Sequence, residues 1–139
     1  MARNRRKKFQ RGNIDGVENA VRNLRALGED VLFAAELALA DGADMIVADA
    51  KMRCPVKTGE LRDSIKAVDI ANGAAYQISA DARNEQGIPY GQFVEFDPRI
   101  NRPFLYPAID ANIKFIRNDI KLAIQDAIRY RSSYGHGAA

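Results

Sequence analysis

Few side chains in this sequence could act as nucleophiles, proton-transfer groups or metal ligands. Cys54 would need a neighbouring base to act as a nucleophile, and the single histidine, His136, lies in a Gly-containing stretch that we expect to fray. One histidine and one cysteine also argue against a His/Cys zinc site within a single chain.

Two pairs of carboxylates have a spacing that acid–base catalysis could use. Asp41 and Asp44 fall on one face of a predicted helix, and Glu95 and Asp97 flank one aromatic residue. A solvated helix face explains the first pair more simply than catalysis does. The sequence also contains neither GxxxxGK[ST] nor GxGxxG, the Gly-rich patterns that bind phosphates. We therefore predict that the protein is not an enzyme and has no catalytic residue, no metal and no cofactor.

The cationic side chains are more informative, because they are concentrated at the N-terminus. The first eleven residues contain six of the 21 Lys and Arg residues and no acid, so residues 12–139 have 15 cations, all 18 acids and a net charge of −3. Such a segment could neutralise DNA phosphates, bind an acidic protein surface or simply keep the chain soluble. The candidate contact residues are Arg3, Arg5, Arg6, Lys7, Lys8 and Arg11.

Length and composition predict one globular domain between two flexible ends. The chain has 139 residues, of which 47% are hydrophobic and 28% are charged. No apolar run reaches the roughly 20 residues of a membrane span, and no apolar stretch follows the basic start as it would in a secretory signal. A single cysteine suits a reducing compartment. We expect a basic flexible arm at 1–13, a domain at 14–130 and a flexible tail at 131–139.

Helical periodicity accounts for most of the apolar residues. The spacing predicts a helix at about 16–27, an interruption at Gly28, and an Ala-rich helix at about 29–52 that ends before a proline. A further helix is predicted at about 104–129, with Pro107 in its first turn.

A β-hairpin is predicted between these helices. The run from 61 to 70 contains β-branched residues that indicate a strand, and AYQISA at 75–80 alternates between apolar and polar residues. Asn72-Gly73 between them is a strong signal for a tight turn, so we place the hairpin at about 64–80. The segment 90–96, YGQFVEF, is too short to distinguish a strand from a helical turn.

These elements predict an α+β fold in one domain. A small antiparallel β-sheet, including the hairpin at about 64–80, is expected to pack against the long helices at about 29–52 and 104–129. Each helix also has a second apolar stripe with seven-residue spacing. These stripes either complete one core or form a subunit interface. Their members are Val31, Ala38, Met45 and Met52 in the first helix, and Ala108, Phe115 and Leu122 in the second.

Three motifs follow one another along the chain. They are CPVKTGELRDSI at 54–65, YGQFVEF at 90–96 and RPFLYPA at 102–108. In this order they resemble the tail-completion family of tailed phages typified by gene product 10 of phage HK97, over about residues 17–130. Two departures are Gly91, where the family usually has Ala, and the Asp97-Pro98 pair, where it has Gly-Thr. The motif residues are Pro55, Val56, Thr58, Gly59, Leu61, Arg62, Tyr90, Phe93, Glu95, Phe96, Pro103, Phe104, Leu105 and Pro107.

The resemblance implies a structural virion protein rather than an enzyme. It implies a homo-oligomeric, hexameric ring around the DNA path at the head–tail junction, with head-closure or connector proteins and tail-tube or tail-terminator proteins as neighbours. It further implies a virion location, with host cytoplasm as the place of assembly and no membrane partner. The basic arm would contact either the passing DNA, without sequence specificity, or a neighbouring protein, and we favour the protein.

Two other functions stay open from the sequence. The chain could be a tail terminator or head-closure subunit of the same connector, or a small nucleic-acid-binding protein that acts through its basic arm. For the motifs themselves we expect structural roles. Thr58-Gly59 is expected to form a fixed turn, and Phe104 and Leu105 to anchor the last helix. Arg62 and Glu95 are a candidate ion pair between the first two motifs.

Overall fold

The computed structural model describes the backbone of residues 2–135 and the side chains of residues 19 and 21–131. The side chains of the predicted basic arm, 1–13, and of residues 132–139 in the predicted tail lie outside this description, as does His136. The elements in chain order are helix α1 (Ala2–Arg53), helix α2 (Glu60–Asp63), strands β1 (Ile65–Asp69) and β2 (Tyr76–Ala80), helix α3 (Gly91–Phe96) and helix α4 (Leu105–Gly135).

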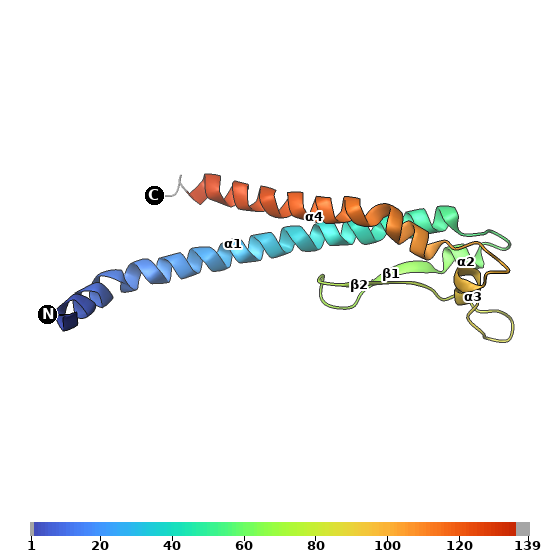
Figure 1. The fold of residues 1–139 in the computed structure, drawn as a ribbon, viewed down its shortest axis with the longest axis horizontal. Coiled ribbons are helices and arrows are strands. Elements are labelled where there is room, and N and C mark those ends of the chain that lie inside the picture. Colours follow the sequence, from blue (N-terminus) through green and yellow to red (C-terminus); the bar gives the residue numbers. More distant parts are fainter. Residues whose placement is uncertain (1, 136–139) are drawn as a thin grey trace.

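The architecture confirms the predicted α+β class. Helices α1 and α4 run antiparallel side by side along the length of the molecule (Figure 1). The two strands form one antiparallel sheet that packs mainly on α1, and α2 and α3 lie with the connecting loops at one end. The short segment 90–96, which the sequence left undecided, is helical.

The predicted break at Gly28 is wrong, because α1 continues through this residue. An exposed glycine within a helix costs only about 1 kcal/mol relative to alanine, which is too little to interrupt a long helix whose other residues favour it. The predicted strand also begins too early. Residues 60–63 form α2, and β1 starts only at Ile65. The left-handed backbone of Gly59 (φ 86°) turns the chain into this helix.

The hairpin forms where the Asn-Gly pair predicts it. Asn72 and Gly73 both have positive φ values, 50° and 91°, as a type I′ turn requires. The Asp69 carboxylate accepts hydrogen bonds from the Ala71 and Gly73 amides at 3.1 and 2.9 Å. The turn lies against α1, because a Cβ on Gly73 would be 3.0 Å from the Glu36 carboxyl carbon.

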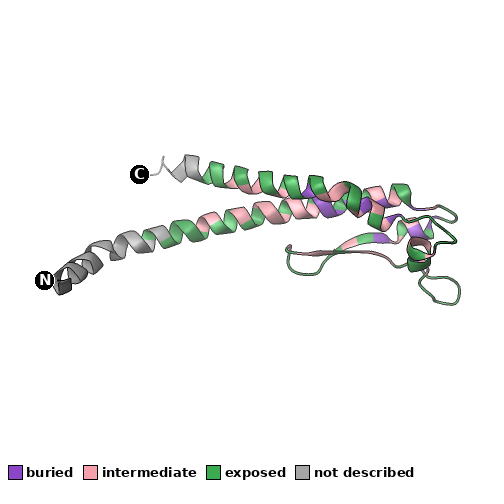
Figure 2. Cartoon of the chain, viewed as in Figure 1, coloured by how far each residue is buried: buried purple, intermediate pink, exposed green. Residues whose placement is uncertain are grey.

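The core occupies only one part of the molecule. We call this part the body; it comprises α1 from Gly42 onwards, the hairpin, α2, α3 and α4 up to Ile116. Buried colour is confined to this region in Figure 2. The core residues from the helices are Ala43, Ile46, Ala50, Leu61, Ala108 and Ile116, together with Cys54, Ile65, Ala82 and Phe104 from the segments between them.

The remaining helical pair extends away from the body, and we call it the stalk (residues 21–41 of α1 and 117–131 of α4). None of its described side chains is buried. One ion pair, between Arg131 Nε and Asp30 Oδ2 at 3.4 Å, joins its two helices among the described residues. Both side chains are nearly half exposed, so this pair contributes little to stability.

Helices α1 and α4 are in close contact at Gly42. A Cβ placed there would be 2.7 Å from Cγ2 of Ile116, so only glycine allows this distance. Further into the body, the Asn112 side-chain amide donates to Asp49 Oδ2 at 2.7 Å, and Arg53 Nε donates to the other carboxylate oxygen at 2.9 Å. These contacts fix the register of the two helices.

Gly42→Ala and Gly28→Ala provide a matched test of this close approach within one helix. At Gly28 nothing lies within 4 Å of the added methyl group, so alanine should raise the free energy of unfolding by about 0.5–1 kcal/mol. At Gly42 the same methyl group overlaps the buried Ile116, and the free energy of unfolding should fall by about 1–3 kcal/mol. Urea unfolding followed by circular dichroism measures both changes. Two changes of the same sign and size would contradict the close approach.

Candidate functional site

The first motif forms the turn that leads from α1 into α2. The left-handed Gly59 sits directly before α2, and the Thr58 hydroxyl accepts a weak hydrogen bond from the Glu60 amide at 3.4 Å. Both features agree with the fixed turn expected for Thr58-Gly59. The preceding Cys54 is buried, half-buried Pro55 follows it, and Val56 and Lys57 are exposed.

The second motif packs against the first at Gly91, which has no side chain. A Cβ on Gly91 would be 2.7 Å from the carbonyl oxygen of Ala80 at the end of the hairpin and 3.4 Å from Leu61. An alanine at this position would therefore require α3 to move. Tyr90 and Val94 are half-buried against the same core, so the hairpin, α2 and α3 form one packed unit.

Glu95 on α3 caps the first turn of α4. Its carboxylate accepts hydrogen bonds from the backbone amides of Phe104, Leu105 and Tyr106, at 2.7, 2.9 and 2.8 Å. The amides in the first turn of a helix lack partners within the helix, and a negative charge there is further favoured by the helix dipole. Pro107, the next residue, has no N–H to satisfy. A single side chain therefore satisfies every backbone donor from 104 to 107.

The same contact places the third motif. Phe104 is only 1% exposed and fills the core beside Ala108, while Leu105 packs partly against it. Pro103 precedes them on the surface. Phe104 and Leu105 thus hold the start of α4 from the inside, and Glu95 holds it through the backbone.

The predicted ion pair between Arg62 and Glu95 is wrong. Arg62 Nε lies 3.4 Å from the Asp63 carboxylate, and the Glu95 oxygens are occupied by the α4 amides. Backbone amides at a helix start compete successfully for the carboxylate, since they are already fixed in position and Arg62 is flexible.

Two aromatic residues of the second motif are exposed rather than buried. Phe93 is 56% exposed and Phe96 is 63% exposed, with the Phe96 ring 5.5 Å from that of Tyr106. After Phe96, the Asp97 carboxylate accepts from Arg99 Nη2 at 2.8 Å and Arg99 Nε at 3.1 Å, and these bonds lower the pKa of Asp97. Its carbonyl also accepts from the Ile100 and Asn101 amides. The loop beginning at Asp97-Pro98, where the sequence departs from the family pattern, is thus held by several hydrogen bonds.

The body offers little for catalysis. Burial raises the pKa of the Cys54 thiol, which therefore stays protonated and poorly nucleophilic near neutral pH. Among the described residues, no three His, Cys, Asp or Glu side chains gather as metal ligands. Within the same part of the chain, no helix has the length and apolar character needed to cross a bilayer.

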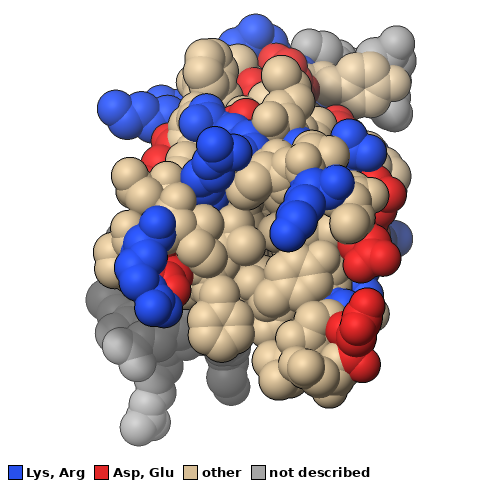
Figure 3. Space-filling model, turned by 90° about the vertical axis from the view of Figure 1, so that its right-hand side faces the viewer, with Lys and Arg blue, Asp and Glu red and all other residues tan. Residues whose placement is uncertain are grey.

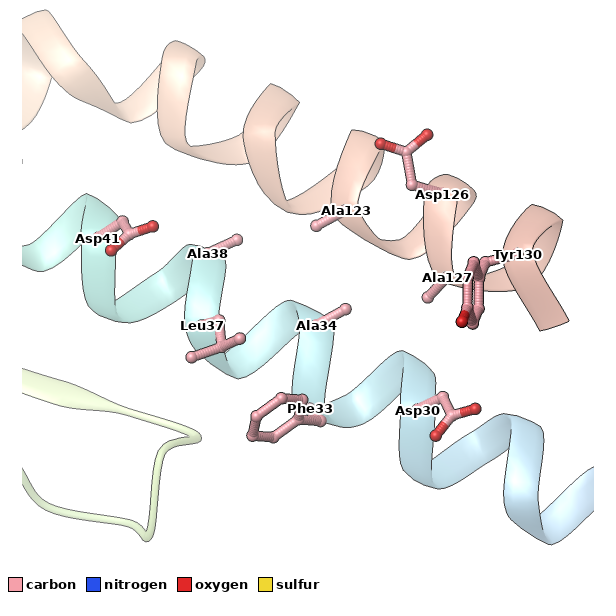
Figure 4. A pocket seen from close by; sticks show the side chains of 10 residues that line it. All are labelled: Asp30, Phe33, Ala34, Leu37, Ala38, Asp41, Ala123, Asp126, Ala127 and Tyr130. Atoms are coloured by element: carbon pink, nitrogen blue, oxygen red, sulfur yellow. The ribbon is translucent and has the colours of Figure 1, made fainter.

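The stalk carries an open groove between its two helices. The small side chains of Ala34, Ala38, Ala123 and Ala127 point into the space between α1 and α4 (Figure 4). Phe33, Leu37 and Tyr130 border them, with Phe33 62% and Leu37 53% exposed. Three carboxylates, Asp30, Asp41 and Asp126, complete the lining.

Most residues of the second apolar stripes are exposed. Met52 is 86% exposed, and Met45, Phe115 and Leu122 are also exposed, whereas Ala108 is buried. Packing in one core therefore accounts for few of these residues. The alternative interpretation, an interface with another subunit, fits the remainder.

Comparison with known protein families shows which family the chain belongs to. The family described as "Bacteriophage HK97-gp10, putative tail-component" matches residues 18–96. The chain belongs to this family. No curated protein and no solved structure is significantly similar to it.

Membership in the HK97 gp10-like family supports a bacteriophage tail component located in the virion, and a structural rather than enzymatic role. The matched segment includes most of α1, the hairpin and α3, and it ends at Phe96, immediately after Glu95. The third motif and α4 lie beyond it. Glu95 therefore links the part of the chain that the family match covers to the helix that it does not.

Replacing Glu95 by alanine tests this link. The variant leaves three amides at the start of α4 without an acceptor, and we expect the free energy of unfolding to fall by about 2 kcal/mol or more. Amide hydrogen exchange at residues 104–106 should become faster than elsewhere in α4. Glu85→Ala, in an exposed loop, is the matched control and should change neither quantity. Unchanged exchange at 104–106 in Glu95→Ala would contradict the capping role.

Proposed function

We propose that this HK97 gp10-like chain is a tail-completion protein that forms a hexameric ring around the DNA path at the head–tail junction. The main support for a ring is the exposure of the stalk. Its described residues include 36 positions of two helices without one buried side chain. Helices derive most of their stability in water from packing an apolar face, and this pair has exposed apolar faces that other subunits can cover.

The charge distribution supports a place around DNA. Residues 12–139 carry a net charge of −3, so this part of the chain has no general attraction for phosphates. A channel that lets DNA pass gains little from strong phosphate contacts. The six cations at the N-terminus are instead assigned to an acidic surface on a neighbouring protein, such as a head-closure, connector or tail-tube subunit.

Inactivating the gene in a phage that encodes this chain tests the proposed function. Filled heads and separate tails should accumulate, and infectivity should return when the protein is supplied in trans. Electron microscopy of the lysate measures the fraction of joined particles. Joined particles at normal frequency in the absence of the protein would contradict a role in completing or joining the tail. Tails of uncontrolled length would indicate the alternative role of tail terminator.

Deleting residues 2–11 tests the partner of the basic arm. If the arm binds a neighbouring protein, the truncated chain should still assemble with itself but should no longer support head–tail joining. Salt-dependent DNA binding by the purified full-length chain, lost on deletion, would favour the nucleic-acid-binding alternative. Joined particles that fail to retain DNA would likewise show that the arm contacts DNA rather than protein.

A further inference from the structure

We propose that the groove of the stalk binds the exposed aromatic corner of the next copy of the chain, so that copies join head to tail. This corner, which we call the knob, comprises Phe93, Phe96, Arg99, Ile100 and Arg102. The proposal rests on the proposed ring and specifies which surfaces form it.

The groove has the chemistry of a binding surface for an apolar and cationic partner. It has a volume of about 560 Å³, and its side chains include four alanines, two large aromatic rings and a leucine. Three carboxylates and no Lys or Arg complete its lining among the described residues. Asp30 is paired with Arg131, but Asp41 and Asp126 have no ion-pair partner within the described part of the chain.

The carboxylates of the groove disfavour a dimer in which the grooves of two copies face each other. A two-fold dimer through this surface would place Asp41 and Asp126 of both copies in one interface, with no cation in the lining to compensate them. Like charges in such an interface cost several kcal/mol and exclude the pairing. The occupant must therefore be a different surface that combines apolar side chains with cations.

The knob provides that combination on the same chain. Phe93, Phe96 and Ile100 are exposed large apolar residues within eight positions of one another. Arg99 and Arg102 are exposed beside them, and Arg102 has no ion-pair partner among the described residues. The knob belongs to the body end of the molecule, where α3 is labelled in Figure 1, and a view onto that end shows Lys and Arg spread over the face together with Asp and Glu (Figure 3).

The knob is also held in a defined shape before binding. Three contacts fix the loop that carries it. Arg99 pairs with the Asp97 carboxylate, two backbone amides donate hydrogen bonds to the Asp97 carbonyl, and the Phe96 ring contacts Tyr106. Rigid aromatic anchors lose little conformational entropy on binding and commonly dominate interface energies. Because the groove lies on the stalk and the knob on the body, their contact repeats from copy to copy and closes into a ring if the rotation allows.

Two variants separate this interface from other modes of association. The groove variant combines Asp41→Lys with Asp126→Lys, and the knob variant combines Phe93→Ser with Arg102→Glu. All four residues are exposed, so the fold should be retained, which circular dichroism and thermal unfolding can verify. The charge-matched control combines Asp44→Lys with Asp110→Lys, two exposed carboxylates that do not line the groove. Masses are measured by size exclusion with light scattering at high micromolar concentration.

The expected result is a ring-sized species for the unmodified chain and the control, and monomers for each variant alone, with subunit affinity reduced at least about tenfold. Mixing the two variants should yield a heterodimer, because one retains its groove and the other its knob. Variants that assemble normally, or a mixture that stays monomeric, would overturn the proposal. If deletion of residues 2–11 abolished self-assembly, the result would indicate that the groove binds the basic arm instead of the knob.

A full-length chain that stays monomeric at these concentrations would also overturn the proposal. It would not overturn the role in tail completion, because the gene-inactivation experiment measures joined particles independently of assembly in solution. Conversely, normal joining without the protein would refute that role and leave the mixing result intact. The failure of either claim can therefore be recognised separately.

Discussion

One carboxylate joins the two parts of this fold. Glu95 lies nine to eleven residues before the amides whose hydrogen bonds it accepts, and it is the last residue but one of a helix that packs on the hairpin. Without it, the start of α4 would lose its acceptors at the edge of the core, at a cost of about 1–3 kcal/mol for each buried donor. Since Gly91 fixes α3 against Ala80, this one side chain connects the start of α4 to the hairpin.

The body and the stalk have opposite relations to solvent. In the body, Phe104, Ile65 and the alanines of α1 and α4 close a small core around the Glu95 cap. In the stalk, the same two helices continue without any buried described residue, although Leu24, Leu32 and Phe33 are large and apolar. In the proposed ring, neighbouring subunits cover these side chains and remove them from water.

The sequence predicts this fold well where local energies act alone, and less well where distant residues compete. The Asn72-Gly73 turn and the apolar period of both helices are local signals, and the structure follows them. The break at Gly28 fails because about 1 kcal/mol cannot end a long helix. The Arg62–Glu95 pair fails because backbone amides, which leave no trace in side-chain identity, take the carboxylate. The groove needs two helices to form and could not be read from either one.

In the proposed ring, charge limits how the exposed apolar surface can be used. An apolar face alone would pair with any similar face, whereas Asp41 and Asp126 make contact with another groove unfavourable and require cations on the occupant. The net charge of −3 over residues 12–139 likewise disfavours adhesion of the chain to DNA. A head-to-tail contact occupies one groove and one knob in each copy. An open row leaves one of each exposed at its ends, so closure buries the last free groove and knob and favours a ring over a filament.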